Sequence, residues 1–260
     1  MDPEKEIEFF DRFAAQHGEY DVLGERGYRR LTELFERLIR PSREEVCVDL
    51  GCGTGAFTAH LRRFGLKLSG MDISAVSIEQ ANRQADGESY AVGDITATQL
   101  PDASQNIVVY SGVLHHFPTV EDRSRVLAEG FRILSPGGRM FSYDPNAHSP
   151  SMWLYRDPRS PLFSNKGKTE NEVLLRRKEL AEEVGAAGFR SFLIRGVAGI
   201  SFRFVMSERA RSLLALYNAY EQVLRFSPFE NRFGTFLVCV AKKSEQAADH
   251  SDGSDTNPRR

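Results

Sequence analysis

Apolar positions recur at helical spacing along the first 42 residues of the chain. Intervals of three and four residues predict helices here, and we expect residues 1–44 to form an N-terminal helical cap. Gly18, Gly24 and Gly27 are expected to divide the stretch, because glycine weakens a helix interior. The apolar positions are Phe9, Phe10, Phe13, Leu31, Leu34, Phe35 and Leu38.

From residue 45 onward, short apolar runs alternate with amphipathic stretches. This alternation predicts an α/β fold with a Rossmann-like, mainly parallel sheet that carries helices on both faces. The predicted strands span residues 46–50, 66–72, 89–93, 106–111, 139–143, 190–196 and 234–243. The predicted helices between them span residues 56–64, 74–84, 123–134, 170–187 and 208–226.

Two stretches interrupt this rhythm and are predicted to be cap segments inserted into a domain of residues 45–243. Residues 145–170 contain four prolines and are expected to cover the open edge of a site. Residues 206–228 include an apolar helix that we expect to form a lid, with an acceptor wall or a membrane-contacting face as alternatives. The polar tail, residues 244–260, is expected to be disordered because it has little apolar surface to bury.

Length, charge and cysteine content narrow the class of protein. A chain of 260 residues suits one domain with a cap, and its net charge of −2 gives no overall attraction to nucleic acid. The three cysteines, Cys47, Cys52 and Cys239, form no disulfide or zinc pattern. With no signal peptide and no apolar run long enough to span a membrane, we expect a cytoplasmic protein. Peripheral membrane contact stays open, and the composition indicates no oligomeric state.

A glycine turn follows the first predicted strand. Gly51 permits a sharp exit from the strand, Gly53 lets a ligand approach the backbone, and Gly55 lets the next helix pack closely. The N–H groups at such a helix start favour a polar or anionic ligand group. Because Gly51-x-Gly53-x-x-Ala56 also satisfies the relaxed dinucleotide fingerprint, a nicotinamide-dependent oxidoreductase stays open.

Acidic residues near this turn favour a different cofactor. Asp72 ends the second predicted strand, where a carboxylate can accept hydrogen bonds from ribose hydroxyls. Asp49 lies two residues before Gly51, and a carboxylate there suits a cationic sulfonium such as that of S-adenosylmethionine better than a pyrophosphate. Asp94 can accept from an adenine amino group while Ile95 packs on the ring.

Together these segments resemble the class I S-adenosylmethionine-dependent methyltransferases, and most closely the small-molecule type that includes quinone-biosynthesis enzymes. The resemblance covers about residues 45–145. It implies a seven-stranded sheet with an antiparallel last strand and S-adenosylmethionine as cofactor. It also places Asp49 and Gly51 near the methionine part, Asp72 and Ile73 at the ribose, and Ser111 near the methyl group. The segments are Val46–Gly55, Gly70–Ser74, Gly93–Ile95, Ser111–Phe117 and Leu134–Gly138.

The candidate catalytic residues are His115 and His116, which follow the fourth predicted strand. An imidazole can accept a proton near neutral pH, although a packing role for this pair is the alternative. No metal site is predicted, because no third ligand is evident. The resemblance implies that an N-terminal aromatic, Tyr20 or Tyr28, closes over the cofactor, with structural packing as the alternative.

The acceptor is predicted to be a small molecule methylated at oxygen, nitrogen or carbon. The basic stretch 153–178 either holds an anionic group of this acceptor or is a solvated face. Similar enzymes that methylate an amino nitrogen of adenine carry an Asn/Asp-Pro-Pro-aromatic motif after the fourth strand. Its absence from this sequence argues against nucleic acid as acceptor. A protein that binds S-adenosylmethionine without catalysis is the remaining alternative.

Overall fold

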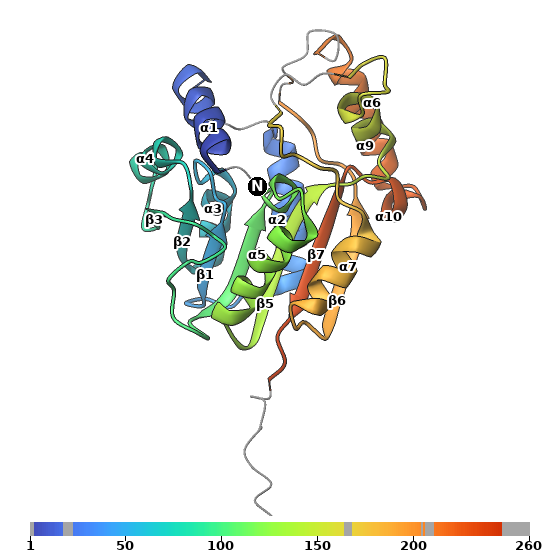
Figure 1. Cartoon of the computed structure of the whole chain (residues 1–260). Coiled ribbons are helices and arrows are strands. Elements are labelled where there is room, and N and C mark those ends of the chain that lie inside the picture. Colours follow the sequence, from blue (N-terminus) through green and yellow to red (C-terminus); the bar gives the residue numbers. More distant parts are fainter. Residues whose placement is uncertain (1–2, 18–22, 164–167, 204, 206–210, 246–260) are drawn as a thin grey trace, which may run out of the picture.

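The computed structural model, which describes residues 3–17, 23–163, 168–203, 205 and 211–245, shows an α/β domain built on one sheet (Figure 1). Within these residues seven strands pair in the order β3-β2-β1-β4-β5-β7-β6. Their bounds are β1 Val46–Leu50, β2 Lys67–Asp72, β3 Ser89–Val92, β4 Gln105–Ser111, β5 Leu134–Pro145, β6 Ser191–Val197 and β7 Phe236–Lys242.

Strands β1 to β5 pair in parallel, and β7 runs antiparallel between β5 and β6. Both the predicted sheet and its antiparallel last strand are confirmed. The connection from β6 to β7 is long, because α9 (Leu214–Arg225) and α10 (Glu230–Phe233) lie between the two strands.

Helices cover both faces of the sheet because consecutive strand residues point to opposite sides. In β1, Cys47 packs into a core with α2 (Glu25–Ile39) and α3 (Ala56–Leu61). Val48 packs into the opposite core with α5 (Val120–Ile133) and α7 (Arg177–Ala186). The remaining helices are α1 Pro3–His17, η1 Arg62–Phe64, α4 Ala75–Arg83, η2 Leu114–His116 and α6 Pro150–Arg156.

The N-terminal region holds the two helices α1 and α2. Gly24 is the N-cap of α2, but Gly27 lies inside this helix and does not interrupt it as predicted. A Cβ at Gly27 would lie 2.8 Å from the carbonyl oxygen of Ser201, so a small residue is needed where the two segments meet. Gly18 lies outside the described residues.

One of the predicted helices begins later than the sequence pattern indicates. Helix α7 starts at Arg177, not at residue 170, because the preceding chain pairs with other segments: Leu175 bridges Asn146, and the Val173 N–H donates to the His115 carbonyl. Helix α9 starts at Leu214, and Leu216 and Val223 on it are 68% and 72% exposed. Residues 206–210 and 246–260, on which the lid and tail predictions partly rest, lie outside the described residues.

No helix in the described part of the chain is both long enough and apolar enough to span a membrane.

Candidate functional site

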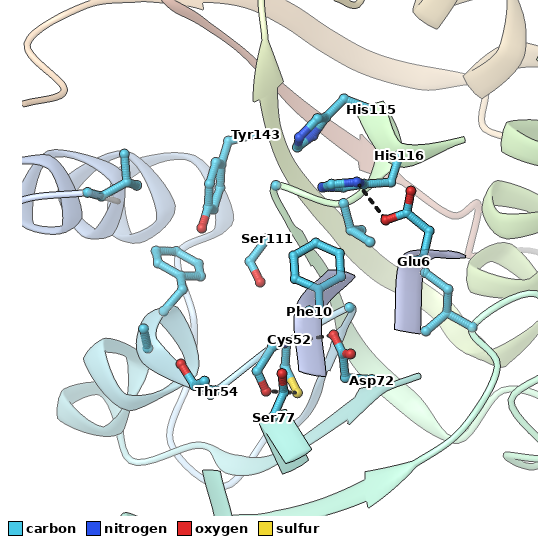
Figure 2. A pocket seen from close by; sticks show the side chains of 18 of the residues that line it. Glu6, Phe10, Cys52, Thr54, Asp72, Ser77, Ser111, His115, His116 and Tyr143 are labelled. Carbon is cyan, nitrogen blue, oxygen red and sulfur yellow. Dashed lines mark hydrogen bonds and ion pairs between the residues drawn. The ribbon is translucent and has the colours of Figure 1, made fainter. Parts of the chain in front are cut away.

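One cavity of about 1390 Å³, part of it open solvent, lies at the carboxyl edge of the parallel strands. Ligands of open α/β sheets bind at this edge. Figure 2 shows side chains from distant parts of the chain converging on it. Its lining includes predicted cofactor residues, namely Gly51, Gly53, Asp72, Ile73, Asp94, Ile95 and Ser111. Further lining residues are Glu6, Phe10, Tyr28, Phe57, His115, His116, Tyr143, Met152, Arg156, Phe202 and Phe236.

The glycine turn has the backbone shape that the sequence pattern requires, since Gly51, Gly53 and Gly55 all have positive φ. A Cβ at Gly51 would lie 2.3 Å from a methyl carbon of Val113. A Cβ at Gly53 would meet no protein atom within 4 Å, so the space in front of it is open to a ligand. Gly55 does not line the cavity; its close neighbour is the ring of Tyr90.

Asp72 is held at the end of β2 by two backbone donors. The Gly53 N–H donates to Oδ2 at 2.8 Å and the Ser74 N–H donates to Oδ1 at 2.9 Å. Burial raises the pKa of Asp72, and these hydrogen bonds oppose that rise. The carboxylate is therefore fixed in orientation while it still lines the cavity.

Asp49 lies beneath the turn and does not line the cavity. It is fully buried and accepts hydrogen bonds from the hydroxyls of Thr58 and Ser111, both at 2.7 Å. Burial raises its pKa to about 6 despite these two bonds. Asp49 thus connects β1, α3 and β4, and its place near the methionine part of the cofactor stays a prediction. Ser111 does line the cavity, with its hydroxyl turned toward Asp49.

The two histidines belong to the short helix η2 and have different partners. Nδ1 of His115 lies 3.0 Å from Oδ1 of Asp144, which also accepts from the His115 backbone N–H. Burial lowers the pKa of His115 well below its usual value. Nδ1 of His116 lies 3.3 Å from Oε2 of Glu6. Burial opposes protonation of His116, but the contacts with Glu6 and the charge of Glu172 outweigh it and raise its pKa.

Helix α1 contributes Glu6 and Phe10, which the sequence analysis did not select. The Phe10 ring lies 5.3 Å from the His116 ring, centroid to centroid, and both residues line the cavity. Asp11 accepts from the Ser74 hydroxyl at 2.6 Å and so ties α1 to α4. The spacing of Glu6 and Phe10 on one helical face was the available signal. Tyr20 lies outside the described residues, whereas Tyr28 lines the cavity.

One part of the cavity wall is mostly aromatic. Phe57, Tyr143, Phe202 and Phe236 line it, and their rings contact one another. Arg156 is the member of the basic stretch that reaches this wall, whereas the Arg159 side chain is 81% exposed and pairs with Asp157. The described residues of α9 do not line the cavity, so a wall or lid formed by this helix finds no support there.

Comparison with known proteins identifies the central segment. Residues 48–142 match the family model of a methyltransferase domain. A malonyl-[acyl-carrier protein] O-methyltransferase from Yersinia pestis is 34% identical over 36% of this chain and 34% of its own length. A 27-O-demethylrifamycin SV methyltransferase from Amycolatopsis mediterranei is 29% identical over 48% of each chain. This chain thus spans between about a third and a half of these curated relatives.

Solved structures show the same fold over nearly the whole chain. A possible histamine N-methyltransferase from Thermotoga maritima matches with a TM-score of 0.64 and 19% identity, covering 91% of this chain and 99% of its own. Phosphoethanolamine N-methyltransferase 2 from Haemonchus contortus, in complex with S-adenosylhomocysteine, matches with a TM-score of 0.63 and 16% identity. That match covers 90% of this chain and 60% of its own.

The strand order, the glycine turn and the family match define an α/β domain of the methyltransferase type. Residues 48–142 carry a methyltransferase domain, and the sheet around them has the Rossmann-like fold of the class I S-adenosylmethionine-dependent methyltransferases. S-adenosylmethionine is the cofactor of the domain. The open space in front of Gly53 is suited to a cofactor that approaches the backbone. The oriented carboxylate of Asp72 is suited to a ribose.

Proposed function

We propose that this chain transfers the methyl group of S-adenosylmethionine to a small, largely apolar acceptor. The observation that supports this most is that a single cavity contains both the glycine turn with its oriented carboxylate and, beside it, two histidines with an aromatic wall. Such a cavity can bring a cofactor and an acceptor together at one edge of the sheet.

Each part of the cavity has a separate task in this proposal. Asp72 holds the ribose hydroxyls, while Asp94 and Ile95 hold the adenine. When bound, S-adenosylmethionine supplies a methyl group on a positively charged sulfur, which is already a good leaving group. The protein contributes mainly alignment of the acceptor atom, because correct orientation removes much of the entropic barrier.

The acceptor part explains the choice of substrate class. Its aromatic wall favours an apolar or aromatic body, and Arg156 can pair with an anionic group at one end. His115 and His116 activate the acceptor atom by taking up its proton. The malonyl-acyl-carrier and rifamycin relatives are both named for methylation at oxygen, which favours oxygen as the first atom to test.

The nicotinamide alternative receives less support from the sheet. A dinucleotide-binding sheet has the parallel order 3-2-1-4-5-6, whereas here the antiparallel β7 lies between β5 and β6. A protein that binds S-adenosylmethionine without catalysis would differ from the proposal in activity alone. An assay of methyl transfer therefore separates the two.

The test is transfer of a labelled methyl group from S-adenosylmethionine to hydroxylated aromatic acceptors and to malonyl thioesters. We expect transfer by the wild type, and a loss of roughly a hundredfold or more when His115 and His116 are both changed to alanine. His148→Ala changes an exposed histidine outside the cavity and serves as the control. S-adenosylmethionine binding without transfer to any acceptor would favour the non-catalytic alternative.

A further inference from the structure

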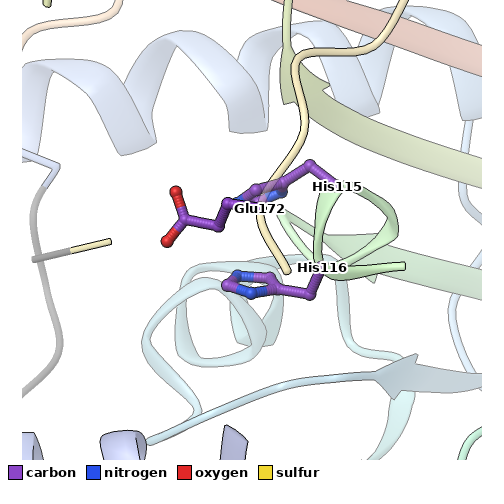
Figure 3. A group of neighbouring side chains, drawn as sticks. All are labelled: His115, His116 and Glu172. Carbon is purple, nitrogen blue, oxygen red and sulfur yellow. The ribbon is translucent and has the colours of Figure 1, made fainter. Parts of the chain in front are cut away.

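We propose that His115, His116 and Glu172 form a binding site for one divalent transition-metal ion at the histidine end of the cavity. One ligand atom of each residue lies within 4.8 Å of the other two (Figure 3). The sequence offers no third ligand beside the two histidines. The structure supplies it from the chain before α7, 56 residues beyond His116 (172 − 116).

Both imidazoles are oriented in the way that metal-binding histidines usually are. Asp144 contacts Nδ1 of His115 at 3.0 Å, and Glu6 contacts Nδ1 of His116 at 3.3 Å. A carboxylate at one ring nitrogen fixes the ring and leaves the other nitrogen, Nε2, for a metal ion. The two outer carboxylates come from α1 and β5, so the arrangement joins distant segments.

Glu172 completes the set as a buried carboxylate, 9% exposed. Its Oε1 accepts from the Thr169 N–H at 3.0 Å, and its Oε2 lies 3.1 Å from Nη1 of Arg156. A carboxylate has about four lone-pair positions, so these contacts leave room for a metal bond. Ligands about 2.1 Å from one tetrahedral ion lie about 3.4 Å apart. The three ligand atoms, which lie within 4.8 Å of one another, therefore need to approach by up to about 1.4 Å when an ion binds.

Carboxyl groups gather around the two rings. The buried groups of Glu6, Asp144 and Glu172 meet there, with Arg156 close to Glu172. In the described part of the chain, Oδ2 of Asp144 is buried without a hydrogen-bond partner. Such an atom is costly to bury, and a nearby metal ion lowers that cost.

The ligand set indicates the class of metal. Two imidazoles and one carboxylate suit Zn²⁺, Fe²⁺ or Co²⁺, and three protein ligands leave a coordination position for a substrate. The assignment of a role rests on the proposed function. With an ion on both imidazoles, the ion would replace the histidines as the activating group, since an acceptor oxygen bound to it would lose its proton more readily. Metal binding itself does not depend on that function.

The experiment uses the full chain after treatment with a chelator and dialysis. Co²⁺ is titrated in while its visible absorption bands are recorded, and bound Zn²⁺ is counted by elemental analysis. We expect one ion per chain. Glu172→Gln and, separately, His116→Gln should weaken Co²⁺ binding by at least about tenfold, since even outer contacts of metal ligands change affinity by about 10–100-fold.

The matched control is Glu170→Gln, which removes a carboxylate two residues from Glu172 but at an exposed position paired with Lys5. It should bind Co²⁺ like the wild type, and the thermal midpoints of all three variants report on folding. Absence of a bound ion, or equal binding by Glu172→Gln and the wild type, would overturn the metal site. In that case S-adenosylmethionine binding could still hold, so the two proposals fail separately.

Discussion

Two aspartates beside the same glycine turn show how hydrogen-bond partners determine the role of a residue. Asp49 has both oxygens occupied by the hydroxyls of Thr58 and Ser111 and does not reach the cavity. Asp72 is held by backbone N–H groups and still faces the cavity. The sequence spacing predicted that both matter, but only the structure separates the one that lies beneath the turn from the one that lines the cavity.

Asp72→Ala is therefore expected to weaken S-adenosylmethionine binding by at least roughly tenfold, or about 1.4 kcal/mol. The variant loses the acceptor for the ribose and also leaves the Gly53 N–H without its partner. Calorimetric titration measures the change, with exposed Asp86→Ala as the control. An unchanged dissociation constant for Asp72→Ala would contradict the placement of the ribose.

At the scale of elements, buried charged pairs fix the helices that surround the site. Arg123 on α5 and Glu183 on α7 form a bidentate pair, 4% and 3% exposed, with Nη2 2.6 Å from Oε1. Arg123 also donates to the Phe117 carbonyl just beyond the two histidines. This pair joins the outer helices to the segment that carries the candidate catalytic residues.

Removal of one partner from this pair should be strongly destabilising. We expect Glu183→Ala to lower the free energy of unfolding by about 3–5 kcal/mol, because Arg123 would stay buried without its countercharge. Denaturant unfolding measures the loss. Glu182→Ala, whose carboxylate pairs with Lys178 at the surface, should stay within about 1 kcal/mol of the wild type. Similar losses in both variants would contradict a special role for the buried pair.

A second contact between elements, made by Glu221, makes the free energy of unfolding depend on pH. Glu221 on α9 is fully buried, and burial raises its pKa to about 7 although the Thr235 hydroxyl and the Gly199 N–H donate to it. The folded chain therefore holds this proton more tightly than the unfolded chain. The resulting stability is fully present below pH 4.5, the usual pKa of the group, and is lost as the pH rises through about 7.

Between pH 5 and pH 8 the wild type should thus lose more stability than Glu221→Gln, by at most about 3 kcal/mol. The glutamine keeps the shape of the side chain but has no proton to release. Denaturant unfolding of both proteins at the two pH values gives the difference. Parallel pH profiles would show that the Glu221 carboxyl does not titrate differently in the folded chain.

At the scale of the whole molecule, the sequence predicts the sheet much better than the surroundings of the two histidines. The strands lie where the alternation of apolar runs with amphipathic stretches predicts them, because each strand carries its own apolar pattern. His116 pairs with Glu6 and lies near Glu172, with a ligand atom of each within 4.8 Å, although these residues are far apart in the chain. Helical spacing shows which face Glu6 and Phe10 share, but not what that face meets. Glu172 was hidden because the sequence predicts a helix over residues 170–187, whereas Glu172 lies just after a turn and before α7.

The most direct test of the cofactor site is calorimetric titration of the wild type with S-adenosylmethionine, S-adenosylhomocysteine and NAD. We predict one site per chain for each of the two sulfur compounds and no binding of NAD. At a hundredfold excess over its dissociation constant, S-adenosylmethionine should also stabilise the fold by about 2.7 kcal/mol. Binding of NAD, or no binding of either sulfur compound, would contradict the assignment of the glycine turn and its acids to a sulfonium cofactor.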